Sequence, residues 1–248
     1  MPAGSSARFA PYHRYDRNFF LAYVALIWLG IVMGFGGDIV DHIKSHAPAF
    51  PLIVHVHAIA FVGWLVVLTT QVLLIRTGRH DLHRNLGLAA VALYAVMLVL
   101  GPATAFVVDH ATLGTPDADP AFIAIQGTDI IAFAGLAGAA IALRGNAPAH
   151  KRLMLLATLY ISDAGFARWL GSDIHHLMGQ GYWARFASLY LANDVLILGL
   201  GAYDLATRGR LQAVYLPAVA WTFAFQMTAI YLYLDPAWKP VAVSILSL

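Results

Sequence analysis

The sequence contains no cysteine, and charged residues make up only 11% of its 248 positions. The absence of cysteine excludes disulfides, thiolate-bound metal sites, cysteine-ligated iron–sulfur clusters and covalently attached haem of the c type. A soluble domain needs about 25% charged residues to cover its surface. Most of the surface of this chain must therefore face something other than water, and the lipid bilayer is the expected surrounding.

The formal net charge is also small, at +2, which excludes the strongly basic surface of a nucleic-acid-binding protein. What the chain has instead is hydrophobic residues, which form 60% of the total and lie in long continuous runs. In lipid, only helices and closed barrels satisfy their backbone hydrogen bonds internally. Continuous apolar runs predict helices, because the strands of a barrel would alternate apolar and polar residues over segments of about 10 residues. The expected fold class is all-α, an integral membrane bundle.

Runs of about 20 mostly apolar residues predict about seven transmembrane helices in a single domain that covers residues 1–248. Glycine and proline residues separate these runs. Asp163 and Arg168 interrupt the fifth run, which is the least regular. The expected ranges are 18–36, 51–75, 86–108, 121–143, 152–171, 183–206 and 212–234.

Lysine and arginine are distributed unevenly between the two ends of the predicted helices. Four of them lie at one end, namely Lys44, Arg168, Arg185 and Lys239, and the other eleven of the 15 lie at the opposite end, on the side of the N-terminus. Basic residues accumulate on the cytoplasmic side of a membrane. The sequence therefore predicts a cytoplasmic N-terminus and an outer C-terminus, in a bacterial inner membrane.

Two histidines occupy equivalent positions at the predicted cytoplasmic side. His83 precedes the run 86–108, and His150 precedes the run 152–171. Two imidazoles at one depth can ligate a haem iron from both sides and so form an electron-transfer centre, with Gly87 leaving room for the porphyrin. The alternative interpretation is that both histidines are ordinary interfacial side chains, since histidine beside a basic residue is common at helix ends.

A second set of ionisable residues lies in the predicted outer half of the membrane. It comprises His57, Asp129, Asp163 and Asp194, with His55 on the opposite face of the helix that carries His57. A lone carboxylate in lipid costs several kcal/mol, so we expect these groups to face the interior of the bundle.

Three interpretations of this outer set remain open. The set could bind a divalent transition metal such as zinc, copper or iron. It could form a proton relay or a pocket for a quinone. In the third interpretation, Asp163 and Asp194 pair with Arg168 and Arg185 and only fix the packing of the helices.

The stretch from His55 to His110 resembles the haem-binding core of cytochrome b561-type transmembrane proteins. The residues that carry the resemblance are His55, His57, Gly63, the run from Gln71 to Arg76, His83, Gly87 and His110. The resemblance covers about half of the chain. Other segments are similar to uncharacterised bacterial multi-pass membrane proteins, which supply no function.

The resemblance implies two b haems, each held by histidines from alternate helices of a four-helix core. His83 and His150 would hold the cytoplasmic-side haem, and His57 or His55 would be one ligand of an outer haem. The chain departs from the family pattern in the fourth helix, where Gln126 and Asp129 stand in place of a partner histidine. That departure puts the second haem in doubt.

The sequence thus predicts a membrane protein that binds haem b and transfers electrons, with a quinone or a redox protein as partner and oxidoreductase activity as one outcome. The first alternative is a metal-dependent membrane enzyme or metal-handling protein that uses the outer histidine and aspartates. The second is a non-catalytic subunit or assembly factor of a membrane complex. An oligomer is compatible with each of them.

Overall fold

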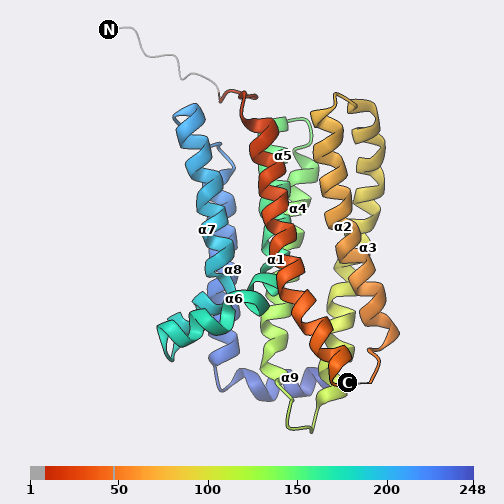
Figure 1. Ribbon diagram of the computed structural model, residues 1–248. Helices are drawn as coiled ribbons and strands as arrows, with labels where there is room; N and C mark the ends of the chain where they lie inside the picture. Colours follow the sequence, from red (N-terminus) through yellow and green to blue (C-terminus); the bar gives the residue numbers. More distant parts are fainter. Residues whose placement is uncertain (1–8, 47) are drawn as a thin grey trace.

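The structure, a computed structural model, describes residues 9–46 and 48–248, and every regular element in these ranges is helical (Figure 1). The predicted all-α class is therefore confirmed. The elements are α1 (Asp16–Lys44), α2 (Leu52–Arg76), α3 (His80–Thr112), η1 (Pro120–Phe122), α4 (Ile123–Ala142), α5 (Ala147–Ile161), α6 (Asp163–Met178), α7 (Tyr182–Arg208), α8 (Tyr215–Leu234) and α9 (Trp238–Leu246).

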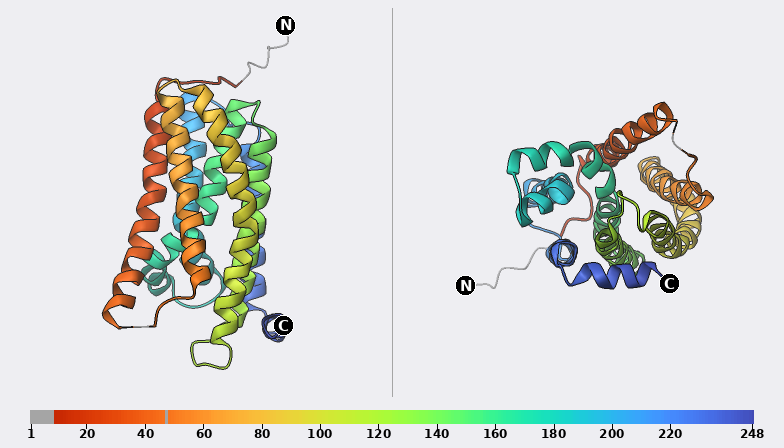
Figure 2. Two further views of the ribbon diagram at one scale, coloured as in Figure 1. Left: turned by 90° about the vertical axis from the view of Figure 1, so that its right-hand side faces the viewer. Right: turned by 90° about the horizontal axis from the view of Figure 1, so that it is seen from below.

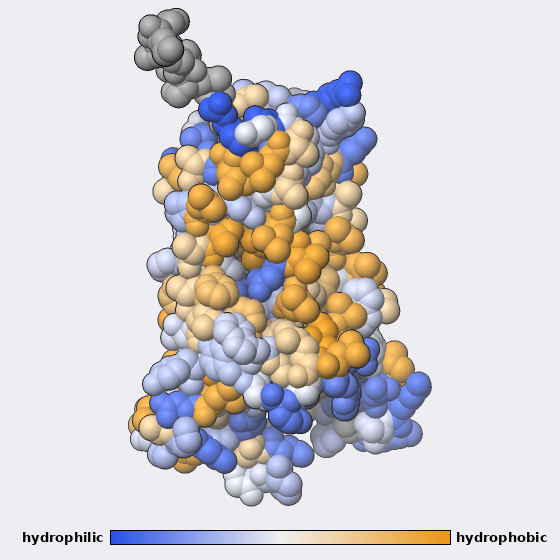
Figure 3. Space-filling view, turned by 90° about the vertical axis from the view of Figure 1, so that its left-hand side faces the viewer, coloured by the Kyte–Doolittle hydropathy of each residue, from blue (hydrophilic) through white to orange (hydrophobic). Residues whose placement is uncertain are grey.

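Five of the described helical segments are long and apolar enough, by length and composition, to cross a membrane: α1, α2, α3, η1 with α4, and α7. Many of their large apolar side chains point outward, as Leu88, Val99 and Leu198 do. Figure 3 shows an apolar belt around the middle of one face, with hydrophilic residues gathered toward both ends. These features indicate a multi-pass helical membrane protein.

Two helices extend well beyond their predicted ranges. α1 continues through Gly36 and Gly37 to Lys44, and α3 already begins at His80. A Cβ atom on either glycine would meet nothing within 4 Å, so neither marks a close packing point or a turn. Glycine costs only about 1 kcal/mol in a helix interior, and here the helix continues past both.

The predicted span 152–171 is wrong as a single helix. The chain there forms α5 and α6, which are separated at Ser162, and α6 turns away to the side of the bundle (Figure 1). The side-chain amide of Asn193 in α7 donates a hydrogen bond to the carbonyl of Leu159, near the end of α5 (2.7 Å). Asp163 accepts one from the backbone N–H of Ala164 at the start of α6 (2.6 Å). The break thus has polar partners for its backbone, as helix ends in a membrane require.

A close crossing of glycines holds α6 against α1. A Cβ atom on Gly34 would lie 2.0 Å from the carbonyl oxygen of Gly165, and one on Gly165 would lie 2.8 Å from the carbonyl oxygen of Gly30. Small residues four positions apart let membrane helices approach in this way. The backbones of α1 and α6 are therefore in direct contact, and a larger residue at position 34 would require them to separate.

The last helix, α9, lies across the end of the bundle opposite the start of α1 (Figures 1 and 2). The indole N–H of Trp238 donates to the carbonyl of Ala121 (3.2 Å), and Nδ1 of His110 is hydrogen-bonded to the carbonyl of Leu246 (2.7 Å). α9 therefore ties η1 and the end of α3 together. Its 9 residues are too few to span a bilayer.

Candidate functional site

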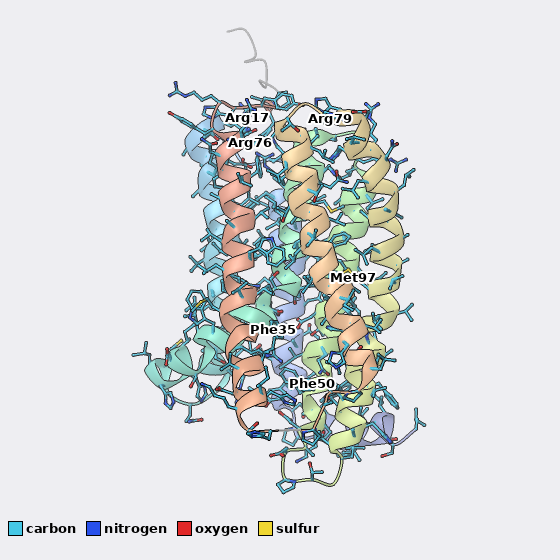
Figure 4. The ribbon with its side chains drawn as sticks, turned by 45° about the vertical axis from the view of Figure 1, so that its right-hand side comes forward. Arg17, Phe35, Phe50, Arg76, Arg79 and Met97 are labelled. Atoms are coloured by element: carbon cyan, nitrogen blue, oxygen red, sulfur yellow. The ribbon has the colours of Figure 1, made fainter. Side chains whose placement is uncertain are left out.

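The rings of His83 and His150 lie next to each other, with their centroids 6.4 Å apart and their planes at 87°. Each histidine is the fourth residue of its helix, α3 and α5 respectively. Both helices pack on α4 and begin at the same end of the bundle, where Figure 4 also labels Arg79, the residue that precedes α3. The two first turns therefore bring the imidazoles to one depth, as the sequence predicts.

The nitrogen atoms of the two rings have different partners. Nδ1 of His150 lies 2.8 Å from the carbonyl oxygen of Ala140, which can only accept, so this nitrogen carries the proton and Nε2 presents its lone pair. Metal-ligating histidines are usually held by such a bond from the non-ligating nitrogen. Nδ1 of His83 is buried, and among the described residues it has no hydrogen-bond partner. An unpartnered buried imidazole nitrogen is consistent with a ligand site.

The separation of the rings fits one metal atom between them. An imidazole nitrogen lies about 2 Å from a metal that it ligates and about 1 Å from its own ring centre, so opposed ligands have centroids about 6 Å apart. Within the described ranges, no group of three or more His, Cys, Asp or Glu side chains is placed to hold a metal ion. A haem iron receives its equatorial ligands from the porphyrin and needs only the two axial ones. Two imidazoles are fewer protein ligands than a free ion of this kind usually has, and they match the two ligands that haem iron takes from a protein.

Small and polar residues surround the histidine pair. The side-chain amide of Gln71 donates to the backbone carbonyl of His83 (3.1 Å), which fixes α2 against the first turn of α3. A Cβ atom on Gly87 would make only an ordinary contact, 3.7 Å from that amide nitrogen, so packing does not demand glycine there.

An ion-pair network fixes the first turn of α5 against α1 and α7. Lys151 and Arg208 each lie 2.7 Å from the carboxylate of Asp16. The guanidinium of Arg152 donates to both carboxylate oxygens of Asp204, and both side chains are fully buried. From the sequence these three cations count as charges of the loops, but the structure pairs them inside the bundle. The network sets the orientation of the turn that carries the second histidine.

The structure does not place a second imidazole beside the outer histidines. His57 is half-buried and stacks on Phe61 with ring centroids 4.0 Å apart, and its Nδ1 has no partner among the described residues. His55 is exposed. Within residues 9–46 and 48–248 no ring contact joins His57 to another histidine, so the bis-histidine ligation that a second haem of this kind needs is not formed there.

Of the predicted outer metal set, the structure brings two members together. The carboxyl groups of Asp129 in α4 and Asp163 at the start of α6 are close enough for their charges to interact directly. Asp194 instead accepts a hydrogen bond from the side-chain amide of Gln226 in α8 (2.9 Å), and His57 stacks on Phe61. The four residues therefore do not form one metal-binding cluster in the part of the chain that is described.

The structure records no ion pair of Asp163 with Arg168, or of Asp194 with Arg185, among the described residues. Arg168 pairs with Asp38 in α1, at 2.8 Å. The guanidinium of Arg185 lies over the ring of Tyr233, 5.4 Å from its centroid. Neither cation takes Asp163 or Asp194 as its partner in a recorded ion pair, although the charge of Arg168 still acts on Asp163.

The sequence analysis did not identify two tyrosines that lie beside the carboxyl pair. The hydroxyl of Tyr190 lies 3.4 Å from Asp129, and the hydroxyl of Tyr160 is buried without a hydrogen-bond partner among the described residues. A signal exists in the sequence, since Tyr160 is three residues before Asp163 and Tyr190 is four residues before Asp194. These spacings place a hydroxyl and a carboxyl on one helix face, although the break at Ser162 changes the first of them.

The site therefore consists of a histidine pair at the end where α3 and α5 begin, and a separate carboxyl pair where α5 breaks. The resemblance to cytochrome b561-type proteins stays a hypothesis. Comparison with known proteins identifies no relative, because no protein-family model, no curated protein and no solved structure matches the chain.

Proposed function

We propose that this chain is a bacterial inner-membrane protein that binds one b-type haem between His83 and His150 and uses it for electron transfer. The observation that carries the proposal is the 6.4 Å separation of two imidazole rings from different helices. His83 and His150 would hold the haem, and a haem held by two histidines would serve electron transfer. Bound haem supplies one-electron chemistry, and a quinone, which dissolves in the same bilayer, is the partner that we propose.

The residues around the histidines have defined tasks under this proposal. The carbonyl of Ala140 holds the ring of His150 with Nε2 free to ligate. The amide of Gln71 holds the turn that carries His83. Arg84 is exposed beside His83, where its charge would neutralise the carboxylates of the haem.

Removal of either histidine is expected to abolish haem binding. The protein purified in detergent should contain one haem per chain by the pyridine haemochromogen assay and should show a sharp reduced α-band, which a quinol restores after oxidation. His83→Ala and His150→Ala should each lose the band, because one axial ligand does not hold a low-spin haem. His80→Ala is the matched control, since His80 is exposed at the first position of the same helix and should leave the spectrum unchanged.

A colourless wild-type protein from cells supplied with haem precursor would contradict the proposal. So would a red protein whose spectrum is the same in all three variants, because haem would then be bound elsewhere. Retention of haem in His80→Ala with loss in the other two variants supports the pair as the axial ligands.

We also propose that the chain crosses the membrane seven times, with α8 and the combination of α5 with α6 completing the five apolar segments. The N-terminus is then cytoplasmic and the C-terminus is outside, in line with the distribution of basic residues. Green fluorescent protein fused after Leu248 should be dark and alkaline phosphatase fused there should be active. A fluorescent C-terminal fusion would contradict this topology.

A further inference from the structure

The carboxyl groups of Asp129 and Asp163 meet in the interior of the bundle, at the point where α5 ends and α6 begins. Asp129 is the seventh residue of α4, so it lies about 9 Å along the helix from its outer end. Asp163 is only 6% exposed. The nearest cation on α6, Arg168, is engaged with Asp38 of α1. No ion pair recorded for the described residues neutralises either carboxyl.

Direct contact between two carboxyl groups requires a proton. An ionised carboxylate has acceptor atoms only, so a hydrogen bond between two of them forms only when one is protonated. Two negative charges in contact within a low-dielectric interior would also repel each other strongly. Because the charges of Asp129 and Asp163 interact and no recorded ion pair neutralises them, we expect the two carboxyl groups to hold one proton between them.

An unpartnered hydroxyl points into the same place. The hydroxyl of Tyr160 belongs to a side chain that is 2% exposed, and it makes no hydrogen bond among the described residues although it interacts with both carboxyl groups. A buried hydroxyl normally has a partner. Tyr190, whose ring centroid is 6.4 Å from that of Tyr160, donates to Asp129 from the other side. The pair is thus surrounded by hydroxyl groups that can pass on a proton.

A polar connection leads from the pair toward the side of the bundle formed by α7 and α8. Asp194 is half-buried in the middle of α7, close enough for its charge to act on the Tyr160 hydroxyl, and it accepts a hydrogen bond from Gln226 of α8. Figure 3 shows hydrophilic atoms within the apolar belt of this face. A carboxyl at that depth has no structural ion-pair partner among the described residues, and such groups commonly mark proton pathways.

We propose that Asp129 and Asp163 form an intramembrane proton-binding site, which holds one proton between two carboxyl groups and exchanges it through Tyr160 and Asp194. In each exchange one O–H bond breaks as another forms, and no group is oxidised or reduced. The titratable and charged groups that face the site are Asp129 of α4, Tyr160 of α5, Asp163 and Arg168 of α6, and Tyr190 and Asp194 of α7. The site needs no haem and does not rest on the electron-transfer proposal.

Infrared difference spectroscopy of the purified protein in lipid nanodiscs tests the site. At neutral pH the wild-type protein should show the C=O stretch of a protonated carboxylic acid, and this band should shift in D₂O. Asp129→Asn and Asp163→Asn should each remove it, because an amide neighbour satisfies the remaining carboxylate without a proton. Asp194→Asn identifies any separate band of Asp194, and Asp38→Asn, at an exposed carboxylate, is the control that should leave the spectrum unchanged.

The wild-type spectrum alone can overturn the proposal, even if a variant fails to fold. A spectrum without a D₂O-sensitive carboxylic acid band would show that both groups are ionised. Loss of the band on addition of sodium or calcium at constant pH would identify a cation site instead. A band that persists in both Asp129→Asn and Asp163→Asn would also reject the pair. The same band should be present in the His83→Ala protein, which separates this test from that of haem binding.

Discussion

Replacement of Gly34 by alanine is expected to force α1 and α6 apart and to destabilise the protein by about 3 kcal/mol, the upper end of the usual range for overpacking. The new Cβ atom would lie 2.0 Å from the carbonyl oxygen of Gly165. That oxygen belongs to the backbone, so no side-chain rotation can relieve the overlap. Thermal unfolding in detergent, followed by tryptophan fluorescence, should show a midpoint several degrees below that of the wild type.

Gly36→Ala is the matched control, because Gly36 lies two residues further along α1 and a Cβ atom there meets nothing within 4 Å. Alanine has the higher helix propensity, so this variant should gain up to about 1 kcal/mol. Equal midpoints for Gly34→Ala and Gly36→Ala would mean that the close crossing of α1 and α6 does not exist in the protein.

Replacement of Asp204 by asparagine should destabilise the protein by about 3 kcal/mol or more, because it leaves the buried charge of Arg152 without its counter-ion. Both side chains are fully buried, and the other carboxylate of the network, Asp16, is already paired with Lys151 and Arg208. The double variant Arg152→Met with Asp204→Leu removes both charges and should recover most of the loss. Thermal unfolding followed by tryptophan fluorescence measures the stability of the single and the double variant.

Asp38→Asn provides the comparison for that prediction. Its ion pair with Arg168 is exposed, with 40% of the arginine side chain and 59% of the aspartate side chain accessible. Exposed pairs contribute at most about 1 kcal/mol. A loss in Asp204→Asn as small as that in Asp38→Asn, or a double variant that is less stable than the single one, would be incompatible with a buried pair.

The helices that the sequence predicts best are those whose apolar run ends at a clear stop signal. The predicted range 183–206 matches α7, and Gly209 ends this helix with a positive φ of 65°. Gly36 and Gly37 have the same residue type but helical dihedral angles, and α1 passes through them. Glycine stops a helix when the chain adopts the left-handed conformation, and residue type alone does not report that conformation.

The break between α5 and α6 could not be predicted from the periodicity of the sequence. Apolar residues continue on both sides of Ser162, so the run resembles a single helix with two interruptions. The partner that stabilises the break is Asn193, whose amide reaches Leu159 from another helix. A tertiary contact of this kind leaves no local signal, and the prediction of one span at 152–171 failed for that reason.

Contacts in the candidate site that depend on where helices begin could be predicted from the sequence. Contacts that depend on how each helix is rotated about its own axis could not. His83 and His150 meet because each is the fourth residue of a helix that begins at the same end. Asp129, Asp163 and Asp194 lie at similar predicted depths, but the rotation of each helix decides that only the first two touch. Depth follows from counting residues, whereas rotation follows from the packing of all neighbouring helices.

The ion-pair network at the start of α5 constrains how the protein is made. Asp16 accepts from Arg208, 192 residues later in the chain. At a synthesis rate of about 5–20 residues per second, Asp16 is therefore synthesised about 10–40 seconds before Arg208, the later of its two basic partners. The complete network, which joins α1, α5 and α7, therefore forms only after α7 has been translated.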